Sequence, residues 1–456
     1  MADYDVIVLG GGPGGSTVAQ RLGQAGRRVL VAEPGRLGGT SVNLGPVPAQ
    51  SLLHAAQTIR DLRAAPAEGI TVTGLNLDWA ALQAKKDAAV QTLVGGLAAL
   101  LKRLKVEVVP AAGRFLAPGV VEVGGRRLTA DHVVIATGSV PNLPPLRGVA
   151  HNPCVVDAAA LLASARVPDR LTILGGDAIG LECASLFSAL GSSVTLLETL
   201  GEIAPFMDAD IAQKLRPAMR PVRFRLGCRL ERLDGGTVYY TTAAGGAEAI
   251  TSDVVLLSLG RRPRFEGWGA ETSGLHITPR GVTVDDRLRT SLPGVWAVGD
   301  VTGRGLGANT AIRSGEIAAA LILDPDQAAK GQVMRWEAVP YTMFGFPEAA
   351  GVGLTERDAE AQGLEVVTAT APLVLSERCV AESGLAATGA VKVVAERATG
   401  QLRGLHLFGP HATEIIWGAA GLLELELTVA DVRQIVFPHP TVAEGIREAC
   451  WAIREQ

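Results

Sequence analysis

Short runs of apolar residues, each ending at a glycine or an acidic residue, recur along the chain. The first, Val6–Leu9, leads directly into a glycine-rich segment, and an amphipathic stretch extends to Gly26 before another apolar run reaches Glu33. The same order returns around residues 172–174 and 193–197. Apolar runs of this length are typical of parallel strands buried on both faces, and the amphipathic segments favour helices. The pattern predicts βαβ units and an α/β fold.

The first glycine-rich segment lies where a dinucleotide-binding fingerprint requires it, between a strand and a helix. Gly10 allows a tight turn, Gly12 lets the backbone approach a pyrophosphate, and Gly15 lets the helix pack on the strand. The helix N-terminus adds partial positive charge. Glu33 follows Gly10 by 23 residues, where a carboxylate accepts hydrogen bonds from an adenosine ribose. We therefore predict a first nucleotide site here.

The second glycine-rich segment repeats the first, because Gly175 again precedes an acid, Glu198, by 23 residues. An internal duplication with two nucleotide sites is therefore expected. Asp177 departs from the pattern, since a glycine normally stands there to let the pyrophosphate come close. Two outcomes are open. Either the carboxylate faces the phosphates and weakens NADH binding, or it turns into solvent and changes little.

Three more apolar strands are expected to end at ligand-binding positions. Residues 133–136 lead to a Thr-Gly turn, residues 254–259 lead to a glycine, and residues 295–298 lead to Asp300. Ligands of open α/β sheets bind at the carboxyl ends of such strands. From about residue 336 the pattern changes to strands such as 391–394 followed by long helical stretches, which predicts a separate α+β domain.

Composition narrows the class of partner. The 456 residues are 48% hydrophobic with a net charge of −4, and the length suggests about three domains. No run of five Lys or Arg residues occurs, so a small molecule is a better partner than nucleic acid or an anionic membrane. An acidic N-terminus and the lack of a long apolar window predict a cytoplasmic protein without a membrane segment. The five cysteines lie at least 29 residues apart, which favours unpaired thiols and no metal site.

These features together resemble the pyridine nucleotide-disulfide oxidoreductases, which include dihydrolipoamide dehydrogenase, mercuric reductase and soluble transhydrogenase. Essentially the whole chain shares the resemblance, and further markers are Gly38-Gly39-Thr40, Phe346-Pro347-Glu348 and His439-Pro440-Thr441. The resemblance implies two Rossmann-like dinucleotide-binding domains, for FAD and NAD(P), and a C-terminal α+β domain that forms a homodimer. The implied boundaries are 1–148 with 270–330 for the FAD domain, 149–269 for the NAD(P) domain and 336–456 for the dimerisation domain.

The resemblance also implies residue roles. Asp300 would hold the FAD ribityl chain, residues 306–309 would present backbone N–H groups to the flavin O2 edge, and His439 with Glu444 would reach the partner subunit's active site. The residues expected to bind FAD are Gly10, Gly12, Gly14, Gly15, Glu33, Gly39, Thr40, Ser41, Gly113, Ala136, Thr137, Gly138, Ser139, Asp300, Leu306, Gly307, Ala308 and Asn309. Those expected near the nicotinamide nucleotide are Gly175, Asp177, Ile179, Gly180, Glu182, Glu198 and Gly260.

The chain departs from the family at its redox motif, G-G-T-C-x-N-x-G-C-x-P-S-K. Ser41 and Pro46 replace both cysteines, and neither side chain supplies a thiolate, so dithiol cycling is not expected. Gln50 replaces the lysine beside flavin N5, although its glutamate partner persists as Glu182. Gln50 either donates a hydrogen bond to N5 or fills space in a helix that begins at Pro48.

The roles of His439 and Glu444 also stay open. A histidine oriented by a carboxylate is a competent acid or base at neutral pH. Residues 441–444 are equally a capping box that starts a helix, and His439 is equally an inherited interface residue.

Three functions are consistent with these residues. The first is an FAD-dependent NAD(P)H oxidoreductase that passes electrons directly to a diffusible acceptor such as a quinone, oxygen, a ferric chelate or a second nicotinamide. Glu198 favours NADH, because a carboxylate suits a ribose hydroxyl and repels a 2′-phosphate. The second is a flavin dehydrogenase or oxidase with His439 as base and a vestigial nicotinamide site. The third is a non-catalytic flavin-binding partner protein.

Overall fold

The computed structural model describes residues 2–326 and 332–454, which form two compact units. Unit 1 comprises Met1–Leu52, Ala80–Asn142 and Gly260–Trp336, and unit 2 comprises Leu53–Trp79, Leu143–Leu259 and Glu337–Gln456. Of the predicted domains, residues 1, 327–330, 455 and 456 lie outside the described residues. The domain boundaries drawn from the sequence stay a prediction, because the two units cut the chain differently.

Unit 1 is built on a seven-stranded sheet, in which β1 (Tyr4–Leu9) lies between β2 (Val29–Ala32) and β6 (Arg126–Ile135). β3 (Glu107–Val109) extends the sheet beyond β2, and β19 (Val295–Ala297) pairs with β6. All four of these pairings are parallel. β1, β2 and β19 are almost entirely buried, which is why their sequences are continuous apolar runs.

Strand β6 serves two neighbours along its length. Its first residues pair antiparallel with β5 (Val120–Val123), which pairs with β4 (Gly113–Ala117), and its later residues pair with β1. The helices α1 (Pro13–Gln24) and α8 (Ala308–Leu323) pack on each other near the sheet. A two-stranded pair, β7 (Ser139–Pro141) with β16 (Arg261–Pro263), completes the part of unit 1 that holds the candidate site.

Unit 2 contains a second parallel sheet, in the order β11-β10-β9-β15-β8. Its strands are β8 (Val155–Val156), β9 (Arg170–Leu174), β10 (Ser193–Leu197), β11 (Arg223–Arg225) and β15 (Val254–Leu257). The helix α6 (Ala178–Leu190) connects β9 to β10, as a βαβ unit requires. An antiparallel sheet of β12 (Arg229–Asp234), β13 (Thr237–Thr241) and β14 (Ala247–Thr251) precedes β15, and the apolar pattern did not predict it.

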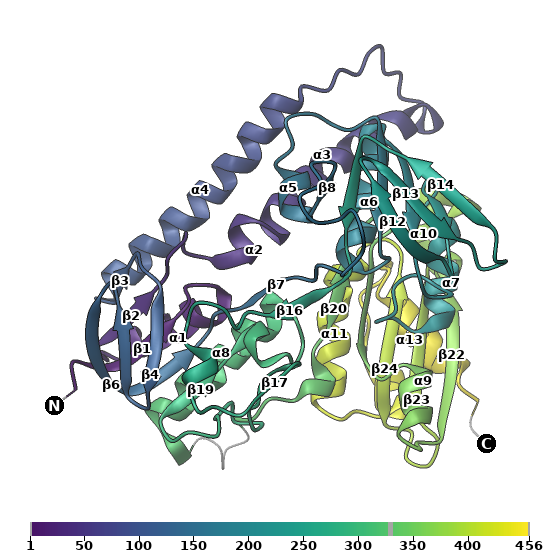
Figure 1. Cartoon of the computed structure of the whole chain (residues 1–456). Coiled ribbons are helices and arrows are strands. Elements are labelled where there is room, and N and C mark those ends of the chain that lie inside the picture. Colours follow the sequence, from purple (N-terminus) through teal and green to yellow (C-terminus); the bar gives the residue numbers. More distant parts are fainter. Residues whose placement is uncertain (1, 327–331, 455–456) are drawn as a thin grey trace. The chain divides into compact units, whose positions relative to one another are not determined.

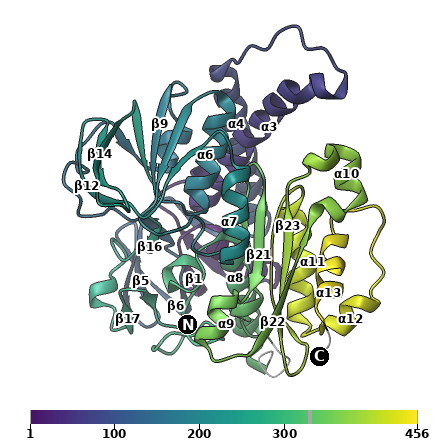
Figure 2. The same cartoon turned by 90° about the vertical axis from the view of Figure 1, so that its right-hand side faces the viewer.

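The remainder of unit 2 is a five-stranded antiparallel sheet with helices packed on it (Figure 2). Its strands are β20 (Tyr341–Met343), β21 (Ala349–Gly353), β22 (Val366–Pro372), β23 (Ala390–Glu396) and β24 (Leu402–Phe408). α11 (Ala412–Glu424) and α13 (Glu444–Ala452) share an apolar core with it. On β23, Val391 and Val393 belong to this core, whereas the intervening Lys392 is buried in an ionic cluster with Asp208.

The other helical segments are short except for α3 and α4 (Figure 1). They are α2 (Gly39–Asn43), α3 (Pro46–Ala64), α4 (Trp79–Arg103), α5 (Ala158–Leu162), α7 (Ala209–Ala218), α9 (Glu356–Ala361), α10 (Glu377–Ser383) and α12 (Val429–Gln434). The predicted fold class is confirmed, with two Rossmann-like parallel sheets and a C-terminal α+β domain. Among the described helices, none has the length and apolarity needed to cross a membrane.

Candidate functional site

The first glycine-rich loop is shaped by close backbone contacts. Gly10 has a φ of +112°, and a Cβ built on it lies 2.3 Å from the Ala136 carbonyl oxygen at the end of β6. A Cβ on Gly15 lies 1.9 Å from the Gly10 carbonyl oxygen. A Cβ on Gly315 of α8 lies 2.6 Å from the Gly14 carbonyl oxygen, so α1 and α8 cross with their backbones almost in contact. A side chain at any of these positions would displace the loop.

Gly12 differs from its neighbours because it faces open space. It is the N-cap of α1, it offers no side-chain cap, and the nearest atom to a Cβ built on it is the Gly39 Cα at 3.8 Å. The first N–H groups of a helix have no partner within the helix and form a favourable place for an anion. This end of α1 therefore has both the room and the donors for a pyrophosphate.

Glu33 holds the loop in shape. Its Oε2 accepts a hydrogen bond from the Gly11 amide at 2.7 Å, and its Oε1 accepts one from the Gly35 amide at 2.8 Å. Glu33 is only half-buried, so its oxygens keep access to a ribose hydroxyl. The adjacent Gly113 begins β4, where a Cβ would lie 2.4 Å from a Leu9 methyl group.

A hydrogen-bonded chain links Arg261, Ser139 and Asp300. The Arg261 Nε donates to Ser139 Oγ at 2.8 Å, and Ser139 Oγ donates to Asp300 Oδ2 at 2.6 Å. The direction is fixed, since a guanidinium only donates and a carboxylate only accepts. Asp300 Oδ1 accepts from the Gly307 amide at 3.1 Å, which ties the carboxylate to the start of α8. Sequence reasoning missed Arg261, although it follows directly after the predicted ligand residue Gly260.

The remaining predicted FAD residues surround these elements in unit 1. Thr137 donates its hydroxyl to the Arg264 carbonyl at 3.3 Å, and Gly138 has open space around its Cα. Leu306 is exposed, and Ala308 and Asn309 lie in the first turn of α8. The residues of the altered redox motif lie on two helices, Gly39, Thr40 and Ser41 on α2, and Pro46 and Gln50 on α3.

These polar groups suit FAD. An uncapped helix end with an open glycine fits a pyrophosphate, and Glu33 and Asp300 supply carboxylates for sugar-like hydroxyl groups. The start of α8 offers further backbone N–H groups for an electronegative ring edge.

The second glycine-rich loop has the same backbone and a different helix cap. Gly175 has a φ of +107°, and a Cβ on Gly180 would lie 2.3 Å from the Gly175 carbonyl oxygen. Asp177 is the N-cap of α6, and its Oδ1 accepts hydrogen bonds from the Gly180 amide at 2.9 Å and from the Ser258 hydroxyl. The carboxylate therefore caps its own helix, an arrangement that neither sequence-based outcome anticipated. An acid directly before a predicted helix is a signal for such a cap.

Glu198 braces the second loop as Glu33 braces the first. Its Oε2 accepts from the Gly176 amide at 2.6 Å, and its Oε1 accepts from the Leu200 amide at 2.8 Å. Unlike Glu33, Glu198 is only 6% exposed. Ile179 lies half-buried in the first turn of α6, one residue before Gly180.

Glu182 lies one turn further along α6. Its Oε1 accepts a hydrogen bond from the Phe344 amide at 2.9 Å, and within the described residues it forms no ion pair. Desolvation raises the pKa of Glu182 to about 7, and the negative charge of Asp177 adds to the shift while the Phe344 amide opposes it. The carboxyl group is thus poised to change charge near neutral pH.

His439 and Glu444 are in contact. His439 Nδ1 lies 3.1 Å from Glu444 Oε1, and the Thr441 amide donates to Glu444 Oε2 at 2.9 Å. Burial on its own raises the pKa of Glu444, but the Thr441 amide, His439 and Arg447 together lower it. Only half of the expected capping box forms, because the Thr441 hydroxyl donates to the Pro438 carbonyl and α13 begins at Glu444 itself. The carboxylate orients an exposed imidazole.

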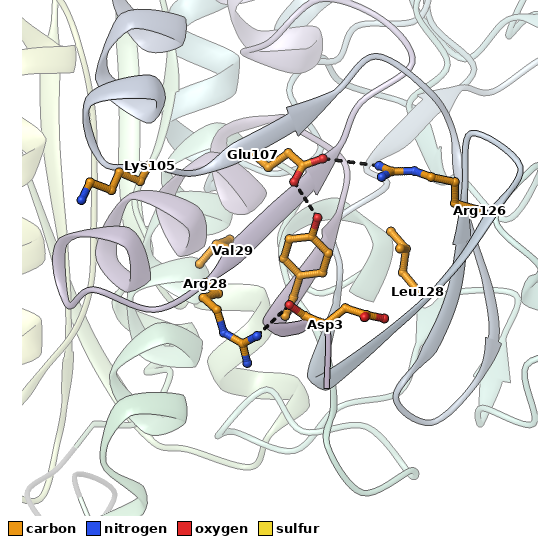
Figure 3. Close-up of a pocket in the computed structure, with 8 residues that line it drawn as sticks. Asp3, Arg28, Val29, Lys105, Glu107, Arg126 and Leu128 are labelled. Carbon is orange, nitrogen blue, oxygen red and sulfur yellow. Dashed lines mark hydrogen bonds and ion pairs between the residues drawn. The ribbon is translucent and has the colours of Figure 1, made fainter. Parts of the chain in front are cut away.

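A surface hollow of about 440 Å³ lies elsewhere in unit 1 (Figure 3). Tyr4, Val29, Glu107 and Arg126 line it from the first residues of β1, β2, β3 and β6, and the Tyr4 hydroxyl donates to Glu107 Oε2 at 2.5 Å. It therefore opens at the amino ends of the parallel strands, whereas nucleotides bind at their carboxyl ends. The glycine loops, and not this hollow, are the candidate cofactor sites.

Comparison with known families agrees with this geometry. The profile described as pyridine nucleotide-disulphide oxidoreductase matches residues 4–315, and that described as its dimerisation domain matches residues 339–450. The chain belongs to this family. Members of this family are flavoprotein oxidoreductases that use FAD and NAD(P). The dimerisation domain indicates that the protein forms a homodimer.

Individual relatives span the full chain. The chain is 39% identical over 465 residues to a dihydrolipoyl dehydrogenase of Thermus scotoductus, covering 100% of this chain and 98% of the relative. It is 33% identical over 466 residues to a leghemoglobin reductase of Vigna unguiculata, covering 99% of this chain and 87% of the relative. The chain also matches a solved structure, the Cu(II) complex of the HOCl-induced flavoprotein disulfide reductase RclA from Escherichia coli. The TM-score is 0.83 at 26% identity, and the match covers 98% of this chain and 100% of that chain.

The cysteines of this family member lie away from the altered redox motif in the chain. All five fall in the residues of unit 2, and the sequence of unit 1 contains none. Burial raises the pKa of the thiols of Cys183, Cys228 and Cys379, and that of Cys450 to about 12. A thiol with a raised pKa is a poor nucleophile, because the thiolate is the reactive form.

Proposed function

We propose that the chain is an FAD-dependent NAD(P)H oxidoreductase that passes electrons directly to a small diffusible acceptor, without a disulfide relay. The observation that carries this proposal is the redox motif, where Ser41 and Pro46 stand in place of the two cysteines, while the glycine loop and carboxylates of unit 1 suit FAD. No cysteine occurs in the sequence of unit 1 to take their place. Quinones, oxygen, ferric chelates and a second nicotinamide are the acceptor classes.

The proposed roles of the residues in unit 1 are binding and orientation. The α1 N-terminus at Gly12 takes the pyrophosphate, Glu33 the adenosine ribose, and Asp300 a ribityl hydroxyl. Ser139 keeps the Asp300 carboxylate oriented, and residues 306–309 offer backbone N–H groups. FAD, when bound, would supply the two-electron chemistry.

His439 is the proposed proton donor to the acceptor. Its contact with Glu444 fixes the orientation of the ring, and a positioned histidine is a common general acid. In the proposed homodimer this pair serves the partner subunit's site. Gln50 is proposed to donate a hydrogen bond near flavin N5.

NADH is the proposed donor in preference to NADPH. Glu198 places a carboxylate at the end of β10, where the adenosine ribose of the donor is expected, and its charge repels a 2′-phosphate. A second candidate function is a flavin dehydrogenase or oxidase with His439 as base, and the Asp177 cap on α6 favours it because it makes the nicotinamide site atypical.

Anaerobic mixing of the FAD-loaded protein with NADH tests the proposal. The flavin absorbance band is expected to bleach within seconds and to return when a quinone is added. A band that stays unchanged with NADH and NADPH, and bleaches only with an organic substrate, would favour the second candidate. A band that no donor bleaches would leave only the non-catalytic flavoprotein.

A further inference from the structure

The two nucleotide units share one motif, so the first serves as a standard for the second. In the first, α1 begins at Gly12, which leaves the helix end open. In the second, α6 begins at Asp177, whose carboxylate occupies the Gly180 amide at 2.9 Å. That amide is one of the first-turn donors that a phosphate at a helix end uses. The N-terminus of α6 is therefore already occupied by an anion, the Asp177 carboxylate.

Ser258 fixes this anion in place. Its hydroxyl donates to Asp177 Oδ1, the same oxygen that caps the helix. Ser258 is 5% exposed and directly follows β15, where its amide donates to the Leu174 carbonyl at 2.8 Å. The carboxylate cannot turn into solvent without breaking both the cap and this part-buried hydrogen bond.

The ribose position shows the same contrast between the units. Glu33 accepts from two backbone amides and is half-buried. Glu198 accepts from two backbone amides and, at 3.2 Å, from the Thr199 hydroxyl, and it is 6% exposed. The N-terminus of α6 and the Glu198 carboxylate normally bind the adenosine diphosphate half of a dinucleotide. In the second unit both already have hydrogen-bond partners in the protein itself.

We propose that Asp177, held by its hydrogen bond from Ser258, is a specificity-determining residue that prevents the second unit from binding the diphosphate of its donor in the usual way. The site then recognises its donor mainly by the dihydronicotinamide ring, and it accepts dihydronicotinamides with and without the adenosine diphosphate half. This inference rests on the proposed function, since it assumes that a dihydronicotinamide reduces the flavin.

The test compares two donors on the FAD-loaded protein without oxygen. NADH carries the diphosphate, and dihydronicotinamide riboside carries the same ring without phosphate. The apparent Kd of each donor comes from the concentration dependence of flavin bleaching. The wild type is expected to bind the two donors within about ten-fold of each other. Asp177→Gly is expected to tighten NADH by about ten-fold, or about 1.4 kcal/mol, and to leave the riboside unchanged.

Two variants make the comparison specific. Thr428 caps α12 of the C-terminal domain through the Asp431 amide at 3.2 Å, so Thr428→Gly removes a helix cap outside the parallel sheet of unit 2 and is expected to leave both Kd values unchanged. Asp177→Asn keeps a helix cap and removes the charge, so it can be measured even if Asp177→Gly folds poorly. It is also expected to lower the Kd for NADH.

The inference is overturned if wild type binds NADH more than ten-fold tighter than the riboside, or if neither Asp177 variant changes the NADH Kd. If no dihydronicotinamide bleaches the flavin in any variant, the proposed function itself fails. The two failures therefore give different readouts.

Discussion

A substitution at Ser139 tests the proposed FAD site. Its hydroxyl joins Arg261 to Asp300 at 2.8 and 2.6 Å, and Ser139→Ala removes both hydrogen bonds at once. The bond from Arg261 Nη2 to the Ser139 carbonyl at 2.9 Å remains, so the pairing of β7 with β16 is expected to persist. The change therefore acts on the orientation of two charged side chains and not on the local fold.

The size of the effect follows from these contacts. A hydrogen bond to a charged group contributes about 1.5–3 kcal/mol, and the lower end applies because Asp300 is half-buried and regains water. Loss of the bond from Arg261 lowers the free energy of unfolding by about 1.5 kcal/mol. The Asp300 bond orients the carboxylate for a ribityl hydroxyl, so its loss weakens FAD binding by roughly ten-fold.

FAD titration of the apoprotein, followed by quenching of flavin fluorescence, measures this change. Ser273→Ala is the matched control, because Ser273 is a buried serine of unit 1 whose hydroxyl donates to the Ala270 carbonyl at 2.8 Å and accepts from the Leu275 amide at 3.2 Å. It is expected to lower stability and leave the FAD Kd unchanged. An unchanged FAD Kd in Ser139→Ala as well would refute the role given to Asp300 and Ser139.

Three further outcomes are expected. Lys392→Ala leaves the carboxylate of Asp208, which is 2% exposed, without its cation, so urea unfolding should show a loss of about 3–5 kcal/mol, and a loss below about 1 kcal/mol would contradict this. Because the pKa of Glu444 is lowered in the folded protein, its ionised form stabilises above the unfolded value of about 4.3, and this contribution disappears as the pH falls through the folded pKa. Glu444→Gln should therefore be less stable than wild type by about 1 kcal/mol at pH 7, and thermal unfolding should show this difference shrinking as the pH falls below about 4.3. Alkylation of accessible thiols with iodoacetamide should leave the rate of NADH oxidation unchanged, and strong inactivation would show that a cysteine takes part.

Much of the fold could be predicted because local signals coincide with it. The glycines at 10 and 175 have the positive φ that their turns require, and the strands before them are buried on both faces. The antiparallel strands β4, β5, β12 and β14 were not predicted, since their residues are partly exposed and carry Arg or Glu among the apolar positions. Their pairing partners, and not their own pattern, define them.

The site was predictable where the motif itself supplies the contact. Glu33 and Glu198 lie next to the loops that their spacing indicated, although their oxygens bind backbone amides. The partnerships of Ser139 with Arg261 and of Asp177 with Ser258 span 122 and 81 residues, and no local pattern reports such distant pairs. The chemistry at these positions depends on those partners, which is why a sequence alone left the state of Asp177 open.

If electrons pass through FAD without a disulfide, the number of electrons that the protein accepts shows it. The purified FAD-loaded protein is titrated with dithionite under anaerobic conditions while the flavin band and the free thiols are followed. A flavin with a redox-active disulfide accepts four electrons per subunit, two on each centre. Direct electron transfer through FAD predicts that reduction is complete at two electrons per FAD with no gain in free thiols, since Ser41 and Pro46 supply no thiol pair. An uptake of four electrons with the appearance of two new thiols would contradict it.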